Sequence, residues 1–124
     1  MKNLQSYPKK KIEVDVHQYG KVTVTAYQVS EQFAIHRTIE NRYSQRGAPM
    51  GWQESAKFWT ITHIPTGRCL FEYLHKGKNA LDVITEIENR WDIVQLLDGQ
   101  VDREKHEGFT EFYFRVKKRI TFGY

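Results

Sequence analysis

The stretch KIEVDVHQYGKVTVTA, residues 11–26, alternates apolar and polar residues on either side of a short turn. An alternation with period two is typical of half-buried β-strands. A three-residue turn over residues 18–20 pairs Val14 with Val24 and places Gly20 where a type I turn followed by a bulge requires positive φ. The sequence therefore predicts an antiparallel hairpin with one apolar face and one polar face.

A second hairpin is predicted for FWTITHIPTGRCLFEYL, residues 58–74. Pro65 suits the first central position of its turn, and Gly67 suits the left-handed position that follows. This register puts the larger apolar residues on one inward face: Trp59, Ile61, His63, Cys69, Phe71 and Tyr73. Two further strands are expected over residues 33–39 and 110–117, the second with Phe112, Phe114 and Val116 pointing inward.

One helix is predicted to begin at Asn79, which can cap it together with Asp82 three residues later. Its apolar residues recur at helical spacing: Ala80, Val83, Ile84, Ile87, Trp91 and Val94. Gly99 can end the helix in the left-handed conformation. We expect this stripe, and Trp91 above all, to be buried against the sheet near Trp59 or Phe71.

These elements predict an α+β fold: an antiparallel sheet of about five strands with one main helix packed on one face, in the order β-β-β-β-β-α-β. A length of 124 residues is typical of a single domain, 1–124. Within it, residues 41–56 (NRYSQRGAPMGWQESA) show no apolar periodicity. We interpret them as a long basic and aromatic insertion without regular structure, a type of segment that is usually functional or disordered.

The cysteine content and the N-terminal residues bear on the cellular compartment. A single cysteine, Cys69, excludes an internal disulfide framework and fits a reducing environment. The first residues, MKNLQSYPKKK, lack the apolar segment of a signal peptide, and no apolar run approaches the ~18 residues of a membrane span. We therefore expect a cytoplasmic protein with no membrane partner.

The net charge of +4 conceals an uneven distribution. Residues 80–102 contain six acidic residues and one basic residue, which leaves eighteen basic and nine acidic residues in the rest of the chain. Such a separation favours a basic surface that could meet a polyanion, although a solvated surface with no partner explains it about equally well.

Residue types able to catalyse a reaction or hold a metal are present but not suitably spaced. No arrangement of histidine, cysteine and acidic residues matches a metal site, and no glycine-rich phosphate-binding motif occurs. His63 and Cys69 could face each other across the second hairpin, but packing explains the pair better than nucleophilic catalysis. A small nuclease using histidines and carboxylates has no supporting spacing either. We therefore expect no cofactor, no metal and no catalytic residue, and we favour a non-enzymatic role over an enzymatic one.

The more informative combination is basic and aromatic. Lys and Arg displace counterions from phosphates, and aromatic rings stack on unpaired bases. The candidate binding residues come from the insertion, its flanks and the last predicted strand: Arg37, Arg42, Tyr43, Arg46, Trp52, Lys57, Tyr113, Arg115, Lys117 and Arg119. Taken singly, each of them is also ordinary for a solvated amphipathic strand.

The hairpin pattern W-x-I-T-H-x-P-T-G at residues 59–67, followed by a capped helix, resembles that of small uncharacterised proteins encoded by phages and plasmids. The strand-strand-helix order is also similar to the small three-stranded-sheet DNA-binding modules of mobile-element recombinases. The similarity covers residues 33–94 and rests on turn and core positions, so it assigns no functional residue. It implies an accessory protein of a mobile element.

Two functions follow as hypotheses. The first is a non-enzymatic accessory protein that binds nucleic acid, either single-stranded or without sequence specificity. It would bind through a basic and aromatic sheet face and the 41–56 loop. The alternative is a protein-binding inhibitor or adaptor, of the kind that phages direct against host or defence proteins, docking through the same loop. Arg, Tyr and Trp also dominate protein interfaces, so composition does not separate the two.

Overall fold

The computed structural model describes residues 3–16, 20–91 and 108–122. Within these residues it confirms the predicted α+β class, with one antiparallel sheet and two α-helices. The elements are η1 (Leu4–Ser6), β1 (Lys9–Val16), β2 (Gly20–Gln28), β3 (Phe33–Tyr43), β4 (Pro49–His63), β5 (Arg68–Leu74), α1 (Gly77–Arg90) and α3 (Phe109–Phe122).

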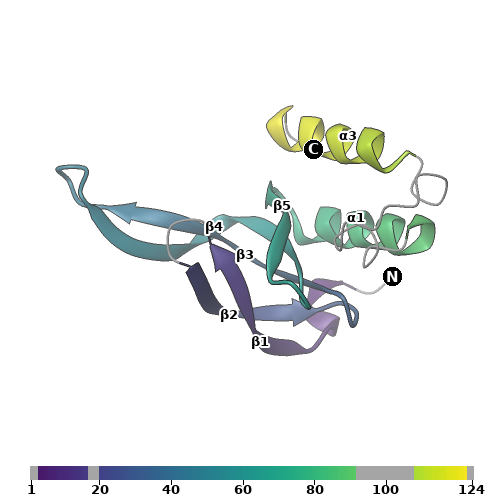
Figure 1. The fold of residues 1–124 in the computed structure, drawn as a ribbon, viewed down its shortest axis with the longest axis horizontal. Helices are drawn as coiled ribbons and strands as arrows, with labels where there is room; N and C mark the ends of the chain where they lie inside the picture. Colours follow the sequence, from purple (N-terminus) through teal and green to yellow (C-terminus); the bar gives the residue numbers. More distant parts are fainter. Residues whose placement is uncertain (1–2, 17–19, 92–107, 123–124) are drawn as a thin grey trace.

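The five strands pair in sequence order, β1-β2-β3-β4-β5, and every neighbouring pair is antiparallel. The sheet curls until β1 approaches the turn that precedes β5 (Figure 1). At that point the Asp15 N–H donates a hydrogen bond of 2.8 Å to the Gly67 carbonyl. The curl gives the sheet an inner face, with β1 and β5 brought together, and an outer face.

Apolar side chains fill two separate clusters. The first lies between the sheet and the helices and contains Phe33, Ile35, Ile61, Phe71 and Leu74 from the strands. The second lies on the opposite side of the sheet, inside the curl, and contains Ile12, Val14, Val22, Val24, Ala26 and Ala34. A curled sheet buries side chains on both faces, and this explains why Thr38, Thr60 and Thr62 on the inner face are buried although polar.

The first hairpin forms as predicted, but its register differs by two residues. Val14 lies opposite Val22 rather than Val24, and Val16 lies opposite Gly20. A shift of two leaves every side chain on its original face, so the predicted apolar face is still the buried one. Gly20 has the predicted positive φ, at 71°, but it begins β2, and the other two predicted turn residues lie outside the described part of the chain.

The second hairpin also forms, with Gly67 at φ 70°, but bulges in β5 alter its faces. Ile61 lies opposite Phe71 as expected, whereas Thr62 lies opposite Cys69. A bulge re-aims the residues beyond it, so Cys69 joins the inner cluster, while His63 packs edge-on against Phe33 of the other cluster. The predicted inward position of Tyr73 is wrong because its side chain is exposed, and Leu74 is buried in its place.

The predicted apolar stripe of α1 is confirmed, but the predicted cap is wrong. Lys76 occupies the N-cap position without a side-chain hydrogen bond, and Asn79 already lies within the first turn. The helix ends at Arg90, and Trp91 is extended, so the predicted continuation is interrupted there. Trp91 is buried in the cluster that includes Phe71, and its ring contacts Phe109 and Phe112. Val94 and Gly99 lie outside the described residues.

The strand predicted over residues 110–117 is wrong, because α3 spans Phe109–Phe122. Phe112 and Val116 are buried, as predicted. Their burial does not distinguish the two conformations, since residues four apart share a face in both a helix and a strand. Phe114 is 64% exposed, which only the helix explains. The fold therefore has a second helix where the sequence predicted a final strand, and the expectation of one main helix is also wrong.

Candidate functional site

The most prominent feature is an arm formed by residues 39–54, in which β3 and β4 continue beyond the curled body. The arm projects away from α1 and α3 (Figure 1). Its strands pair through Ile39 with Glu54, Asn41 with Trp52, and Tyr43 with Pro49. The prediction that this segment lacks regular structure is therefore wrong, because its two strands pair through their backbones. The sequence shows no apolar alternation here because, beyond the base of this two-stranded ribbon, neither face packs on the core clusters of the described residues.

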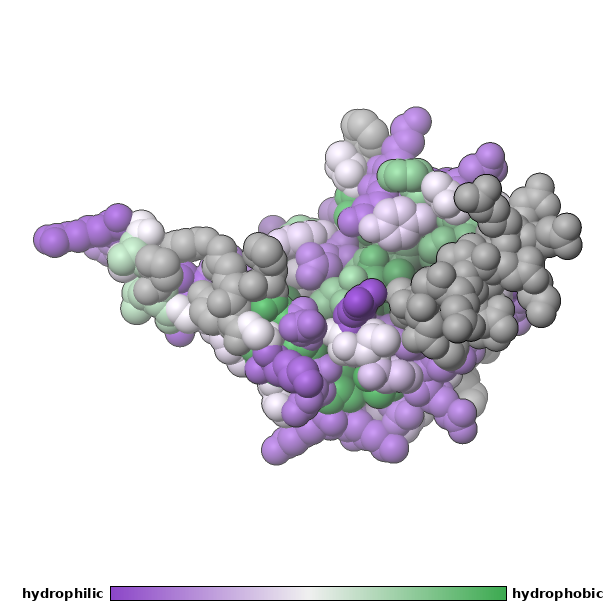
Figure 2. All heavy atoms as spheres, viewed as in Figure 1, coloured by the Kyte–Doolittle hydropathy of each residue, from purple (hydrophilic) through white to green (hydrophobic). Residues whose placement is uncertain are grey.

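The tip of the arm is held by Ser44. Its hydroxyl accepts hydrogen bonds from the N–H groups of Arg46 at 3.3 Å and Ala48 at 3.1 Å. The main chain adds two bonds, from Ser44 N–H to Ala48 O and from Gly47 N–H to Ser44 O. These bonds define the turn and leave the Arg46 side chain exposed in solvent. Figure 2 shows that the far end of the arm is hydrophilic.

Arg37 stabilises the place where the arm leaves the body. β4 carries extra residues here, because Arg37 lies opposite Trp59 while Ile39 lies opposite Glu54. The Arg37 guanidinium donates to the Ala56 carbonyl at 3.2 Å and lies 3.8 Å from the centroid of the Trp59 ring. Arg37 is thus engaged in a structural contact and does not present a free phosphate-binding group.

The candidate residues predicted from the sequence fall into separate groups rather than on one sheet face. Arg42, Tyr43 and Arg46 belong to the distal arm, and Trp52 packs partly against the inner cluster at its base. Lys57 is exposed in β4. The other four, Tyr113, Arg115, Lys117 and Arg119, are on α3. The arm and α3 extend from different parts of the molecule (Figure 1), so these residues form no continuous basic sheet face.

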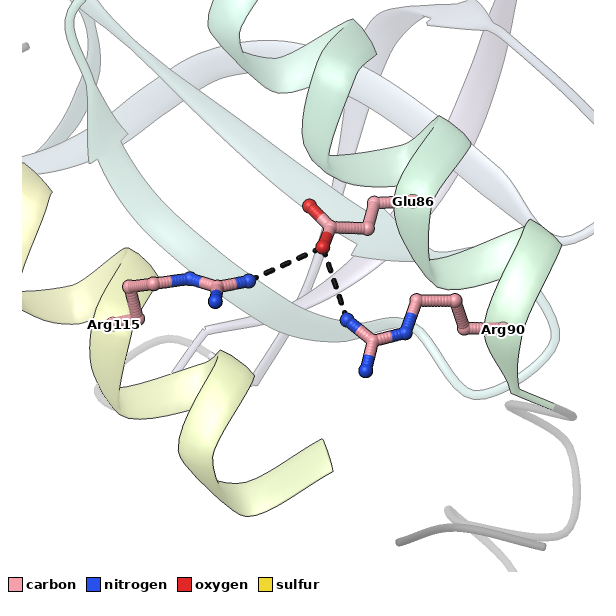
Figure 3. A network of polar contacts seen from close by, with 3 residues as sticks. All are labelled: Glu86, Arg90 and Arg115. Carbon is pink, nitrogen blue, oxygen red and sulfur yellow. Dashed lines mark hydrogen bonds and ion pairs between the residues drawn. The ribbon is translucent and has the colours of Figure 1, made fainter. Parts of the chain in front are cut away.

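Within α3, the Arg115 side chain forms an ion pair. Its guanidinium lies 3.2 Å from Glu86 Oε1 on α1, and Arg90 lies 3.1 Å from the same oxygen (Figure 3). All three side chains are substantially exposed, so the pairs stabilise helix docking only slightly, by about 0–1 kcal/mol each. The Lys117 ammonium lies 5.5 Å from the Tyr113 ring, while Arg119 is exposed in the last turn.

A cavity of about 670 Å³, the mouth pocket, opens on the inner face of the sheet at the base of the arm. Its more buried lining consists of Val16, His36, Ile39, Thr60 and Cys69. Its exposed rim consists of Asp15, Gly20, Asn41, Arg68, Glu72 and Tyr73. The sequence does not reveal this pocket, because all five strands contribute to it and only the curl brings them together.

A buried polar chain runs through the base of the pocket. The Arg37 carbonyl accepts a hydrogen bond of 2.7 Å from His36 Nδ1, and in the neutral imidazole Nε2 then accepts one of 2.7 Å from the Thr62 hydroxyl. Burial lowers the pKa of His36, against a smaller opposing effect of its hydrogen bond to the Arg37 carbonyl. The histidine is therefore neutral at physiological pH.

Cys69 is also unsuited to nucleophilic chemistry. Burial raises the pKa of the Cys69 thiol to about 11, and its Sγ lies 3.6 Å from Thr62 Oγ1. With this pKa the thiol stays protonated at neutral pH, and it is inert because only the thiolate is nucleophilic. The polar base of the pocket can donate and accept hydrogen bonds but offers no activated nucleophile.

Tyr73 on the rim has an unusual backbone. Its φ is 63°, the only positive value at a non-glycine residue in the described part of the chain. An aromatic residue in this region is strained by about 1–3 kcal/mol, and such strain often marks functional positions. The Tyr73 ring packs edge-on against Phe58, with centroids 5.5 Å apart, and it remains 44% exposed.

Comparison with protein-family models, curated proteins and solved structures found no match. In the described residues, no helix has the length and apolarity needed to cross a membrane. No group of three or more histidine, cysteine or acidic side chains in those same residues converges to hold a metal ion. The features that bear on function are therefore the arm, the mouth pocket and the charge distribution.

Proposed function

We propose that this protein binds nucleic acid, with the arm as its principal contact. The observation that carries the proposal is a two-stranded ribbon that projects from the body and ends in exposed arginines. A two-stranded antiparallel ribbon has the dimensions to enter the major groove of a duplex. Among the described residues, the distal arm packs on no other element, and a projecting ribbon of this kind is suited to reach into another molecule.

The charges of the arm support this function. Residues 41–53 contain Arg42 and Arg46 and no acidic residue, while Glu40 and Glu54 are confined to the base. Positive charge is thus greatest at the end that would enter a groove between two rows of phosphates. The excess of basic residues outside residues 80–102 adds a favourable long-range attraction for a polyanion.

Met50 adds an apolar group close to the arginines. Its side chain is 57% exposed, which is high for a large hydrophobic residue. In the major groove, an exposed apolar side chain can contact the methyl group of thymine. The exposed basic residues of α3, including Lys117 and Arg119, would contact the backbone at a second place on a longer nucleic acid.

The test is a titration of fluorescently labelled duplex and single-stranded DNA and RNA, read by anisotropy at several salt concentrations. The double variant Arg42→Ala/Arg46→Ala should weaken duplex binding and should reduce the slope of log affinity against log salt by ~0.9 for each phosphate that is no longer neutralised. Lys78→Ala is the control for charge, because Lys78 is exposed at the start of α1, away from the arm. It should leave the slope unchanged.

Two results would contradict the proposal. One is the absence of binding to any of the four nucleic acids at tens of micromolar protein. The other is binding that the arm variant and the Lys78 control reduce equally, which would indicate general charge attraction. A protein target for the same arm is the competing function, and Met50 is the observation that favours it. Salt-resistant capture of one protein by the wild type and not by Met50→Ser would establish that alternative.

A further inference from the structure

We propose that the mouth pocket binds one unpaired nucleobase with an exocyclic amino group, and that the Tyr73 ring stacks on this base. The inference rests on the proposed function, because the base would belong to the nucleic acid that the arm holds. Asn41 lies in the arm and also lines the pocket, so the pocket opens directly beside the segment expected to enter the groove.

The size and location of the cavity suit a base. A volume of about 670 Å³ lies in the range typical of small-molecule sites and leaves room for a base with its sugar. The mouth of a curled or closed sheet is a recurrent place for such sites. Ile39, Val16 and Cys69 provide an apolar lining for a flat ring, and the thiol is uncharged.

The charges on the rim distinguish a base from a phosphate. Asp15 and Glu72 contribute two carboxylates against one guanidinium, Arg68, so the rim repels a phosphate more than it attracts one. Carboxylates accept hydrogen bonds from exocyclic amino groups such as the N4 amine of cytosine. Phosphates would remain outside, near Arg42 and Arg46, while the uncharged base enters.

Tyr73 supplies the stacking surface. Its positive φ interrupts the alternation of β5, so that Glu72 and Tyr73 are both exposed and both line the pocket. The conformation is held by a hydrogen bond of 3.3 Å from Tyr73 N–H to Thr38 Oγ1. The edge contacts of Phe58 with Tyr73 and with His75 fix the orientation of the ring. A rigid, exposed ring at the edge of a cavity is the arrangement on which bases stack.

The experiment compares three labelled DNA duplexes by anisotropy: fully paired, with one unpaired cytosine, and with one unpaired thymine. The wild type should bind the unpaired-cytosine duplex about 5- to 150-fold more tightly than the paired one, the range expected for one stacked base. Thymine, which lacks the amino group, should show a smaller preference. Tyr73→Asn should abolish the cytosine preference, and Tyr73→Phe should retain it because the ring remains.

Tyr73→Asn is a safe substitution for the fold, since asparagine tolerates positive φ better than an aromatic residue does. Arg46→Ala serves as the matched arm variant: it should weaken binding of all three duplexes by the same factor and leave the cytosine preference intact. Equal binding of the three duplexes by the wild type, or a preference that survives in Tyr73→Asn, would overturn the inference while leaving the proposed function standing.

Absence of binding to every duplex, together with absence of binding to single-stranded DNA and to RNA, would instead overturn the proposed function. In that event titration with free cytidine, followed by NMR shifts of the pocket residues, decides whether the pocket binds a base by itself. Shifts that disappear in Tyr73→Asn would support base binding, and no shifts at millimolar cytidine would overturn it.

Discussion

Replacing Phe112 with alanine tests whether residues 109–122 form a helix docked on the sheet. Phe112 is 2% exposed, and its ring lies 5.1 Å from Trp91 and 6.4 Å from Phe71, measured between centroids. Phe114, two residues later, is 64% exposed. Two residues apart is the same face of a strand but nearly opposite faces of a helix, so the same substitution at both positions distinguishes the two conformations.

The expected magnitudes follow from burial. Exposing an aromatic side chain that was fully buried costs about 1.5–3 kcal/mol, and the cavity left by an incomplete collapse adds to this cost. Phe112→Ala should therefore lower the free energy of unfolding by about 3–5 kcal/mol. Phe114→Ala removes mainly solvated surface and should change it by no more than about 0.5 kcal/mol.

The measurement is urea denaturation followed by circular dichroism and by tryptophan fluorescence, to which the Trp91 ring beside Phe112 contributes. The midpoint should fall sharply for Phe112→Ala and remain in place for Phe114→Ala. Equal decreases for the two substitutions would mean that both side chains face the core, and the helical assignment of this segment would be refuted.

Three further outcomes are expected. Gly67→Ala should destabilise the protein by more than about 2 kcal/mol, because the new Cβ would combine positive φ with a contact of 3.1 Å to the Glu13 carbonyl. Gly20→Ala, which has open space around its Cβ, should cost only about 1 kcal/mol. Equal melting temperatures for the two variants would contradict the close approach of β1 to the turn before β5. Burial lowers the pKa of His36 below 6.5, so as pH falls below 6.5 the unfolded state binds a proton that the folded state does not. The free energy of unfolding should therefore decrease over this range. Urea denaturation at pH 7.5 and at pH 5.5 should show a smaller decrease for His36→Asn than for the wild type. The pKa of Cys69 is raised to about 11 in the native protein, so its thiol should react with iodoacetamide at pH 8 much more slowly than in the urea-unfolded protein. Comparable rates in the two states would show that the fold does not shield the Cys69 thiol.

The arm shows a limit of predicting a candidate site from sequence. Residue type alone identifies Arg42 and Arg46, and both are exposed on the arm. Residue type does not reveal their setting, because a ribbon without a core carries no apolar period that would indicate its strands. Alternating aromatic residues favour a strand and hence a sheet face for Tyr113 and Arg115, yet the spacing of Phe112 and Val116 fits the observed helix equally well.

Features that depend on near neighbours along the chain can be predicted without a structure. Alternation identifies the buried faces of β1 and β2, helical spacing identifies the apolar stripe of α1, and turn chemistry identifies Gly20 and Gly67 as residues with positive φ. These features follow from local geometry, since side-chain direction repeats with a fixed period in each kind of secondary structure.

Tertiary packing alone settles the register of the first hairpin, the bulge of β4 against β3, the bulges of β5 against β4, the docking of α3 and the mouth pocket. Each depends on contacts between residues far apart in sequence, such as the bond from Asp15 to Gly67 that closes the curl. A shift of two residues in a strand preserves the apolar pattern, and a bulge leaves no mark in it. The choice among such alternatives is made by the packing of the whole chain, which a local pattern does not contain.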